Sequence, residues 1–105
     1  MSERIKARSP VGRRLRQARA AKDISQKHLG ILAGMDEFTA SARINQYERD
    51  KHVPDFSIAR RLARALGIPV VYLYAEDDDL AELLLSYAQA SRRRRARVKR
   101  LLKRG

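Results

Sequence analysis

One stretch, residues 25–48, constrains the fold of this chain more than any other. Ser25 is a residue type that caps helix N-termini, and apolar residues follow it at helical spacing until Gly34, a typical helix end. After a turn, a second helical run carries Ile44 and Tyr47 on one face and small or polar side chains on the others. The stretch therefore predicts two short helices joined by a sharp turn, the second of which presents polar side chains outward.

A helix-turn-helix has this arrangement and uses it to place its second helix in the major groove of DNA. The same residues resemble the phage-repressor-type (Xre/Cro-like) helix-turn-helix family, over roughly residues 10–74. The residues that carry the resemblance are Arg16–Leu29 (RQARAAKDISQKHL), Gly34, Ile44, Tyr47–Glu48 and Pro54. The resemblance implies an all-α fold, with a repressor-like five-helix DNA-binding domain, and a transcriptional regulator that binds double-stranded DNA as a homodimer.

The chain departs from the family pattern at three places. Gly30 stands where the family usually has alanine, and glycine also allows close helix approach. Asp50 stands where glycine is frequent, and aspartate tolerates the left-handed conformation better than most residues. The segment from Gly34 to Ile44 is longer than usual by about one helical turn. Only the third departure affects function, because it leaves the start of the recognition helix open.

Two starts are compatible with the longer segment. Asp36 could cap a recognition helix that is one turn longer, or residues 36–38 could form an extra turn, with Thr39 or Ser41 as the cap. We favour the extra turn, because acidic side chains at the tip of a helix in the groove would face phosphates. Phe38 is then expected to fill the gap between this turn and the core.

Composition limits the classes of function. The 105 residues are one domain's length, and the net charge of +12 with a pI near 11.1 favours a polyanionic partner. The chain has no cysteine, no apolar run long enough for a membrane span and no apolar signal core, so we expect a cytoplasmic, nucleoid-associated protein. It has no glycine-rich phosphate loop and no carboxylate pair with a positioned histidine. We therefore expect no enzyme activity, no cofactor and no metal site.

The rest of the chain divides into three expected parts: a flexible basic arm (1–8), the helix-turn-helix domain (9–75) and a C-terminal helical extension (76–105). The first helix opens at Ser9-Pro10, and most of its basic residues are expected to be exposed, namely Arg13, Arg14, Arg16 and Lys22. A fourth helix is expected to start at Pro54 and to bury Phe56, Ala59, Leu62, Ala63 and Leu66 before Gly67. Residues 68–74 predict one more short helix, and no strand is expected.

The resemblance places the DNA contacts on and around the second helix of the pair. Aligned from Glu48 backwards, the family's base-facing positions fall on Ser41, Ala42 and Gln46, with Arg43 beside them. Glutamine can bond an adenine edge, arginine a guanine edge, and alanine can touch a thymine methyl; Arg43 could instead clamp a phosphate. The candidates for contacts to the DNA backbone are Gln26, Thr39, Asn45, Arg49 and Lys51. The resemblance also implies an ion pair between Arg19 and Glu48.

The extension is expected to form two helices with a hinge near Ser91, the first of them capped by Asp79. The first helix carries an apolar stripe, which must be buried against the core or a second copy, and we expect it to be the dimerisation region: Leu80, Leu83, Leu84 and Tyr87. The arginine run after Ser91 could track DNA, answer acidic residues of the chain or a partner, or form a solvated face. An alternative function is an antitoxin-like module in which residues 80–105 grip a protein partner and DNA binding serves autoregulation.

Overall fold

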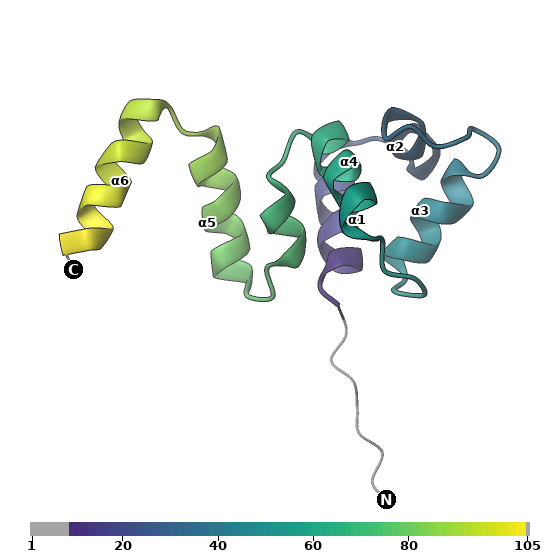
Figure 1. Cartoon of the computed structure of the whole chain (residues 1–105), viewed down its shortest axis with the longest axis horizontal. Helices are drawn as coiled ribbons and strands as arrows, with labels where there is room; N and C mark the ends of the chain where they lie inside the picture. The colour runs from purple at the N-terminus through teal and green to yellow at the C-terminus, as the bar shows by residue number, and fades with distance from the viewer. Residues whose placement is uncertain (1–8, 105) are drawn as a thin grey trace, which may run out of the picture.

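Helices and short connections make up the part of the chain that the structure, a computed structural model, describes, which is residues 9–104 (Figure 1). The elements are α1 (Val11–Lys22), α2 (Gln26–Leu32), α3 (Ala40–Glu48), α4 (Phe56–Leu66), the 3-10 helix η1 (Val70–Tyr74), α5 (Asp78–Gln89) and α6 (Arg92–Arg104). No strand occurs between residues 9 and 104, which confirms the all-α class. The expected basic arm, residues 1–8, lies outside the described residues.

Local side-chain chemistry sets several helix ends. The hydroxyl of Ser25 accepts a hydrogen bond from the backbone N–H of His28 at 2.9 Å and caps α2. Asp55, one residue after the expected start at Pro54, caps α4 by accepting from the N–H of Ile58 at 2.9 Å. Gly67 ends α4 with φ +69°, a left-handed conformation that glycine adopts without steric cost.

The connection between α2 and α3 contains the extra turn. The carboxylate of Asp36 accepts from the N–H of Phe38 at 2.9 Å, and α3 begins at Ala40. Thr39 occupies the cap position, but its hydroxyl donates to the carbonyl of Asp36 and makes no capping bond. The prediction that Phe38 fills the gap to the core is wrong: the turn directs its side chain outward, 87% exposed, and Met35 lies in the core instead.

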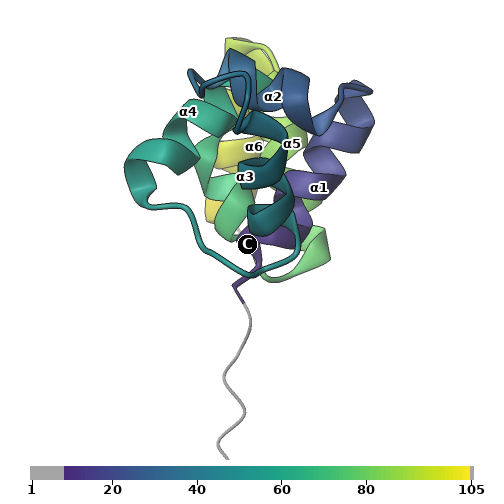
Figure 2. The ribbon, with the colours of Figure 1, turned by 90° about the vertical axis from the view of Figure 1, so that its right-hand side faces the viewer.

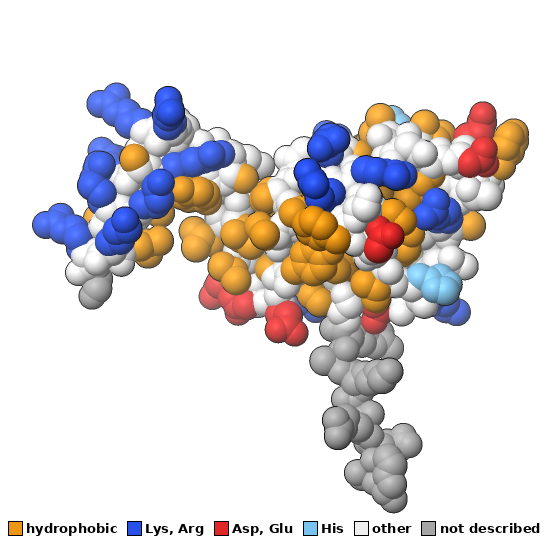
Figure 3. All heavy atoms as spheres, in the orientation of Figure 1, with side chains coloured by type: hydrophobic (Ala, Val, Ile, Leu, Met, Phe, Trp, Pro, Cys, Tyr) orange, Lys and Arg blue, Asp and Glu red, His pale blue; other side chains and the backbone are white. Residues whose placement is uncertain are grey.

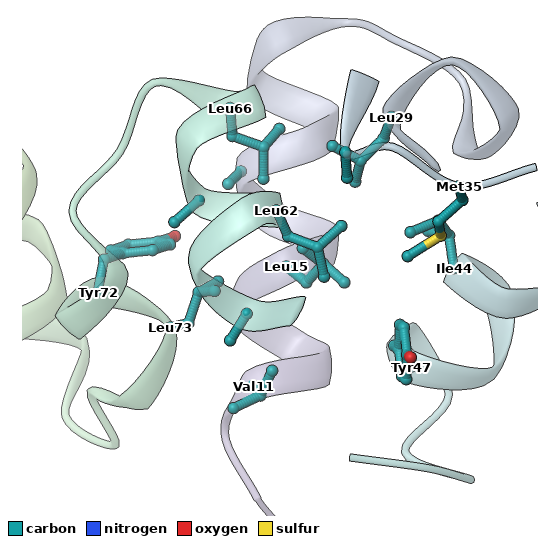
Figure 4. Close-up of a cluster of buried hydrophobic side chains, with 14 of the residues drawn as sticks. Val11, Leu15, Leu29, Met35, Ile44, Tyr47, Leu62, Leu66, Tyr72 and Leu73 are labelled. Carbon is teal, nitrogen blue, oxygen red and sulfur yellow. The ribbon is translucent and has the colours of Figure 1, made fainter. Parts of the chain in front are cut away.

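The core is formed mainly by side chains from α1, α2, α3, α4 and η1 (Figure 4). Ala81 of α5 also belongs to it, and Leu84 and Leu85 of α5 pack against it. Its largest fully buried members are Val11, Leu15, Leu29, Ile44, Leu62 and Leu73. Burial of each such side chain contributes about 1.5–3 kcal/mol, which offsets the ordering of helices too short to persist alone. The expected burial of Phe56 is wrong: it is the first residue of α4, beyond the edge of the core, and its ring lies under the guanidinium of Arg60.

Arg14 differs most from expectation among the residues of α1, because it is buried, with 2% exposure. Its guanidinium donates to the carbonyls of Ala75 (2.8 Å) and Glu76 (3.2 Å) and to the side chain of Gln17 (3.0 Å), and it pairs with Asp78 at 3.0 Å. The chain returning through η1 covers this face of α1, so an arginine that satisfies its carbonyls is stable there. Arg14 thereby ties α1 to the start of α5.

The C-terminal extension forms two helices, as expected, with Ser91 in the short connection between them. Asp77, and not Asp79, caps α5, accepting from the N–H of Leu80 at 2.8 Å; Asp79 lies in the first turn. Within residues 9–104 no helix combines the length and apolar character needed to span a bilayer.

Close backbone approach positions α3. A Cβ atom at Gly30 of α2 would lie 2.5 Å from the Cβ of Ala40, and one at Gly12 of α1 would lie 2.4 Å from the carbonyl oxygen of Tyr47. Real Cβ atoms do not approach so closely, so α1 and α2 reach these positions against α3 because both residues are glycines.

An ion pair then joins α1 to α3. Two guanidinium nitrogens of Arg19 donate to the two carboxylate oxygens of Glu48, at 2.5 and 2.9 Å. The Glu48 side chain is only 3% exposed, and Arg19 also donates to the carbonyl of Ile24 at 2.9 Å. The structure therefore contains the pair that the family resemblance implies, in bidentate geometry.

Gly30→Ala should destabilise the fold, although the same change in an open helix stabilises it by about 1 kcal/mol. The added Cβ has to displace Ala40, which should lower the free energy of unfolding by about 1–3 kcal/mol. Urea unfolding followed by circular dichroism measures this loss. Ala40→Gly removes the Cβ in the way, so the double variant should be more stable than the sum of the single changes predicts. Additive losses would contradict the close contact.

Arg19→Met should cost about 3 kcal/mol of unfolding free energy, because it leaves the buried carboxylate of Glu48 without its cation. The double variant Arg19→Met/Glu48→Leu removes the orphaned charge and should recover part of this loss. Calorimetric or urea unfolding measures both. If Arg19→Met costs no more than a surface change, about 0.5 kcal/mol, the pair does not hold α3 in place.

Candidate nucleic-acid interface

The outward face of α3 carries most of the residues expected to contact bases. Ser41, Ala42 and Gln46 are exposed, and the opposite side of the helix is buried in the core through Ala40, Ile44 and Tyr47. Figure 2 looks at the molecule from this side and shows α3 at its centre. The helix is thus held by its apolar back and leaves a polar ridge facing solvent.

Arg43 lies on the flank of this ridge and is half-buried. One guanidinium nitrogen donates to the hydroxyl of Tyr47 at 3.1 Å, one helical turn further along α3. The buried ring of Tyr47 therefore fixes the direction of the Arg43 side chain before any ligand binds.

A polar corner lies where α1, α2 and α3 meet. The side-chain nitrogen of Gln26 donates to Asn45 at 3.2 Å and to Glu48 at 3.1 Å. The structure thereby brings two expected phosphate-contacting residues, Gln26 and Asn45, against the Arg19–Glu48 pair. Both donor bonds of the Gln26 amide point into the protein, so its side chain has to exchange a partner before it can donate to a phosphate.

Arg16 and Arg49 line a hollow of about 230 Å³ at the polar corner. Arg49 is one of the expected phosphate contacts, whereas Arg16 is an addition to them. Its position, one helical turn before Arg19 on the same helix, is the sequence signal that could have identified it. Both side chains are exposed and could supply positive charge beside the ridge.

The remaining expected phosphate contacts lie at the two ends of α3. Thr39 is exposed before its start, and Lys51 is exposed after its end. The loop after α3 turns at Asp50, which adopts the left-handed conformation with φ +61°. Aspartate tolerates this conformation better than most residues. The backbone N–H of Lys51 donates to the carbonyl of Gln46 at 2.9 Å, which fixes this loop against the helix.

The charges around the ridge differ in how far they are neutralised. The hydrogen bond to Glu48 raises the pKa of Arg19 above its ordinary value, against a smaller lowering by burial, so the guanidinium of Arg19 is charged at neutral pH. The ion pair with Glu48 neutralises this charge locally. The positive potential near α3 therefore comes from exposed side chains such as Arg16, Arg49 and Lys51, which suits an anionic ligand.

Comparisons with known proteins agree with this arrangement. The family described as "Helix-turn-helix domain" matches residues 10–73. Among solved structures, the crystal structure of the transcriptional regulator BswR is similar, with 44% sequence identity, a TM-score of 0.85, and coverage of 90% of this chain and 93% of that one. No curated protein gives a significant match. The chain therefore belongs to the helix-turn-helix domain family, and it is a DNA-binding transcriptional regulator of the Xre-like type.

Proposed function

We propose that this protein is a sequence-specific regulator that reads the major groove of double-stranded DNA as a dimer, with α3 as its recognition helix. The observation that carries the proposal is the polar ridge of α3, exposed to solvent while its apolar back is buried. A major groove about 12 Å wide admits one α-helix presented in this way. The proposed place of action is the nucleoid.

Base recognition falls to the residues of the ridge. The Gln46 amide can donate to and accept from an adenine edge, and the methyl of Ala42 can touch a thymine methyl. Ser41 can donate or accept at the N-terminal end of the helix. Arg43, held by Tyr47, has guanidinium donors with no other partner among residues 9–104, and these suit a guanine edge.

Contacts to the sugar–phosphate backbone fall to the residues around the ridge. Lys51 and Arg49 follow α3 and Thr39 precedes it, so they could meet phosphates on either side of the groove. Gln26 and Asn45 belong to the polar corner and could contact the backbone once their mutual bond is exchanged. Neutralised phosphates release counterions, so these residues supply affinity that falls with salt.

A dimer is proposed because one short helix reads too few base pairs to find a single site in a genome. The arrangement of the chain supports it: α3 lies at one end of the long axis, and α5 and α6 lie towards the other (Figure 1). Two copies joined through α5 and α6 would therefore leave both recognition helices uncovered.

Selection of bound sequences from a random duplex pool, at one stated salt concentration, tests the proposal. The expected result is a two-fold motif whose half-sites lie about 34 Å apart, one turn of DNA. Recovery of unrelated sequences bound with equal affinity would identify a nonspecific coating protein and contradict base reading by α3.

Gln46→Ala and Lys51→Ala should weaken binding in different ways. Loss of the Gln46 amide should relax the preference at one base pair per half-site by about tenfold, since one bidentate contact discriminates by about 1–3 kcal/mol. Lys51→Ala should weaken all sequences alike and reduce the slope of log affinity against log salt by about one for each half-site.

Fluorescence anisotropy on matched duplexes, with each base pair of the selected site changed in turn, measures both effects. Lys27→Ala removes an exposed lysine from α2, outside the residues proposed to touch DNA, and serves as the charge-matched control for Lys51→Ala. An equal loss on every duplex for Gln46→Ala would show that this residue does not read a base.

A further inference from the structure

The connection between α2 and α3 exposes an aromatic ring that the proposed function does not yet use. Phe38 is 87% exposed, more than any other large apolar side chain in residues 9–104. Single apolar side chains are common on protein surfaces, so this exposure alone assigns no role. What sets Phe38 apart is its position, in the extra turn directly before α3.

Hydrogen bonds close this turn and connect it to the core. The carbonyl of Asp36 accepts from the backbone N–H groups of Thr39 at 3.1 Å and Ala40 at 2.9 Å. The Asp36 carboxylate accepts from the N–H of Phe38 at 2.9 Å. Met35 before the turn and Ala40 after it are both buried. The backbone that carries the ring is therefore ordered before any ligand binds, which lowers the entropic cost of a contact.

The turn places Phe38 on the same side as the ridge of α3. A carbonyl that accepts from the N–H four residues later, as that of Asp36 does, closes one turn of α-helix. Phe38 precedes Ser41 and Ala42 by three and four residues, the spacing of neighbours on one helix face. These three residues are exposed, whereas Ala40 between them is buried. The connection also lies at the same end of the long axis as α3 (Figure 1).

The charges beside Phe38 do not suit the sugar–phosphate backbone. Asp36 and Glu37 are exposed, and neither belongs to an ion pair found in residues 9–104. At this end of the molecule, Figure 3 shows acidic and hydrophobic side chains next to one another. Phosphates would repel the two carboxylates, whereas base edges include the amino groups of cytosine and adenine, which are donors. The apolar group that base pairs present in the major groove is the C5 methyl of thymine.

We propose that Phe38 is a specificity-determining residue, whose ring packs on the C5 methyl of one thymine in each half-site, beside the base pair that Ser41 contacts. The inference rests on the proposed function, because it adds a base contact to those made by α3. The extra turn thereby enlarges the reading surface without lengthening α3.

The position of the ring favours DNA over a protein partner as its ligand. A ridge that enters the major groove takes the side chains at its N-terminal end in with it, and the first base contacts of a recognition helix are made there. A protein bound to Phe38 would occupy space that the proposed mode of binding gives to the duplex.

Deoxyuridine tests the contact, because it differs from thymidine only in lacking the C5 methyl. Fluorescence anisotropy with the full chain measures binding to the selected site, in which each thymine is replaced in turn, symmetrically in both half-sites. Loss of the contacted methyl should weaken binding about fourfold per half-site, since burial of one carbon group of this size contributes about 0.8 kcal/mol.

Phe38→Ala should weaken binding to the thymine duplex by at least about the same factor, and should abolish the effect of uracil at this position alone. Phe38→Leu keeps an apolar side chain and should retain part of the effect. The thymine assigned to Ala42 and the preference set by Gln46 should be unchanged in both variants. Phe56→Ala, the same substitution at the other exposed phenylalanine, on α4, is the matched control and should bind as the unmodified protein does.

Asp36 is a positioning residue in this arrangement. Asp36→Asn and Asp36→Ala both remove a negative charge, but asparagine keeps an oxygen that can accept from the N–H of Phe38. Both variants should bind DNA more tightly, because a repulsive charge is lost. Only Asp36→Ala should reduce the effect of uracil. An equal effect of uracil in the two variants would overturn the positioning role of this hydrogen bond.

Two results would overturn the contact of Phe38 with thymine. The first is a Phe38→Ala variant that keeps both the affinity and the uracil sensitivity of the unmodified protein, which would leave the ring to a protein partner. The second is an equal loss on thymine and uracil duplexes, with folding verified by circular dichroism, which would indicate a contact to the DNA backbone.

This contact and the proposed function fail in distinguishable ways. A selected site that keeps its Gln46-dependent preference but has no thymine coupled to Phe38 would overturn the contact and keep base reading by α3. Equal binding of all duplexes would overturn both.

Discussion

The buried carboxylate of Glu48 is the group on which the position of α3 depends. It sits near the C-terminal end of α3, is 3% exposed, and receives hydrogen bonds from Arg19 of α1 and Gln26 of α2. A charge this far from water is stable only with its partners in place, so α1, α2 and α3 have to meet in one geometry. The same geometry turns Ser41 and Gln46 outward. The ion pair therefore fixes the orientation of α3.

Small residues make that geometry possible. Gly30 and Ala40 touch where α2 crosses α3, and Gly12 lies against the backbone of Tyr47. The longer connection before α3, with the Asp36 turn, brings the chain to this crossing without lengthening α3. Two of the departures from the family pattern, Gly30 and the longer connection, thus lie at the same junction between α2 and α3. The sequence alone does not show that they are close in space.

The two ends of the molecule follow different physical rules. The helix-turn-helix unit buries a continuous apolar core, and each ion pair found in residues 9–104 has one buried member, Arg14 or Glu48. The extension separates its charges, acidic at the start of α5 and basic along α6, and leaves leucines exposed between them. Arg14 connects the two, because it is buried in the first unit and bonded to the chain that leads into α5. A change in the packing of α5 would therefore alter the contacts of Arg14 in α1.

Sequence by itself determined the features whose signals are local. These are the cap at Ser25, the helix end at Gly67 and the outward polar positions of α3. Each depends only on neighbouring residues and on the helical period. The family resemblance supplied the Arg19–Glu48 pair, which no periodicity predicts. Only the tertiary structure decided that Arg14 is buried and that Phe38 is exposed, because both depend on segments distant in the chain or on the direction of one turn. It also decided that Gln26 and Asn45 bond each other, since only the packing of α2 on α3 brings their side chains together.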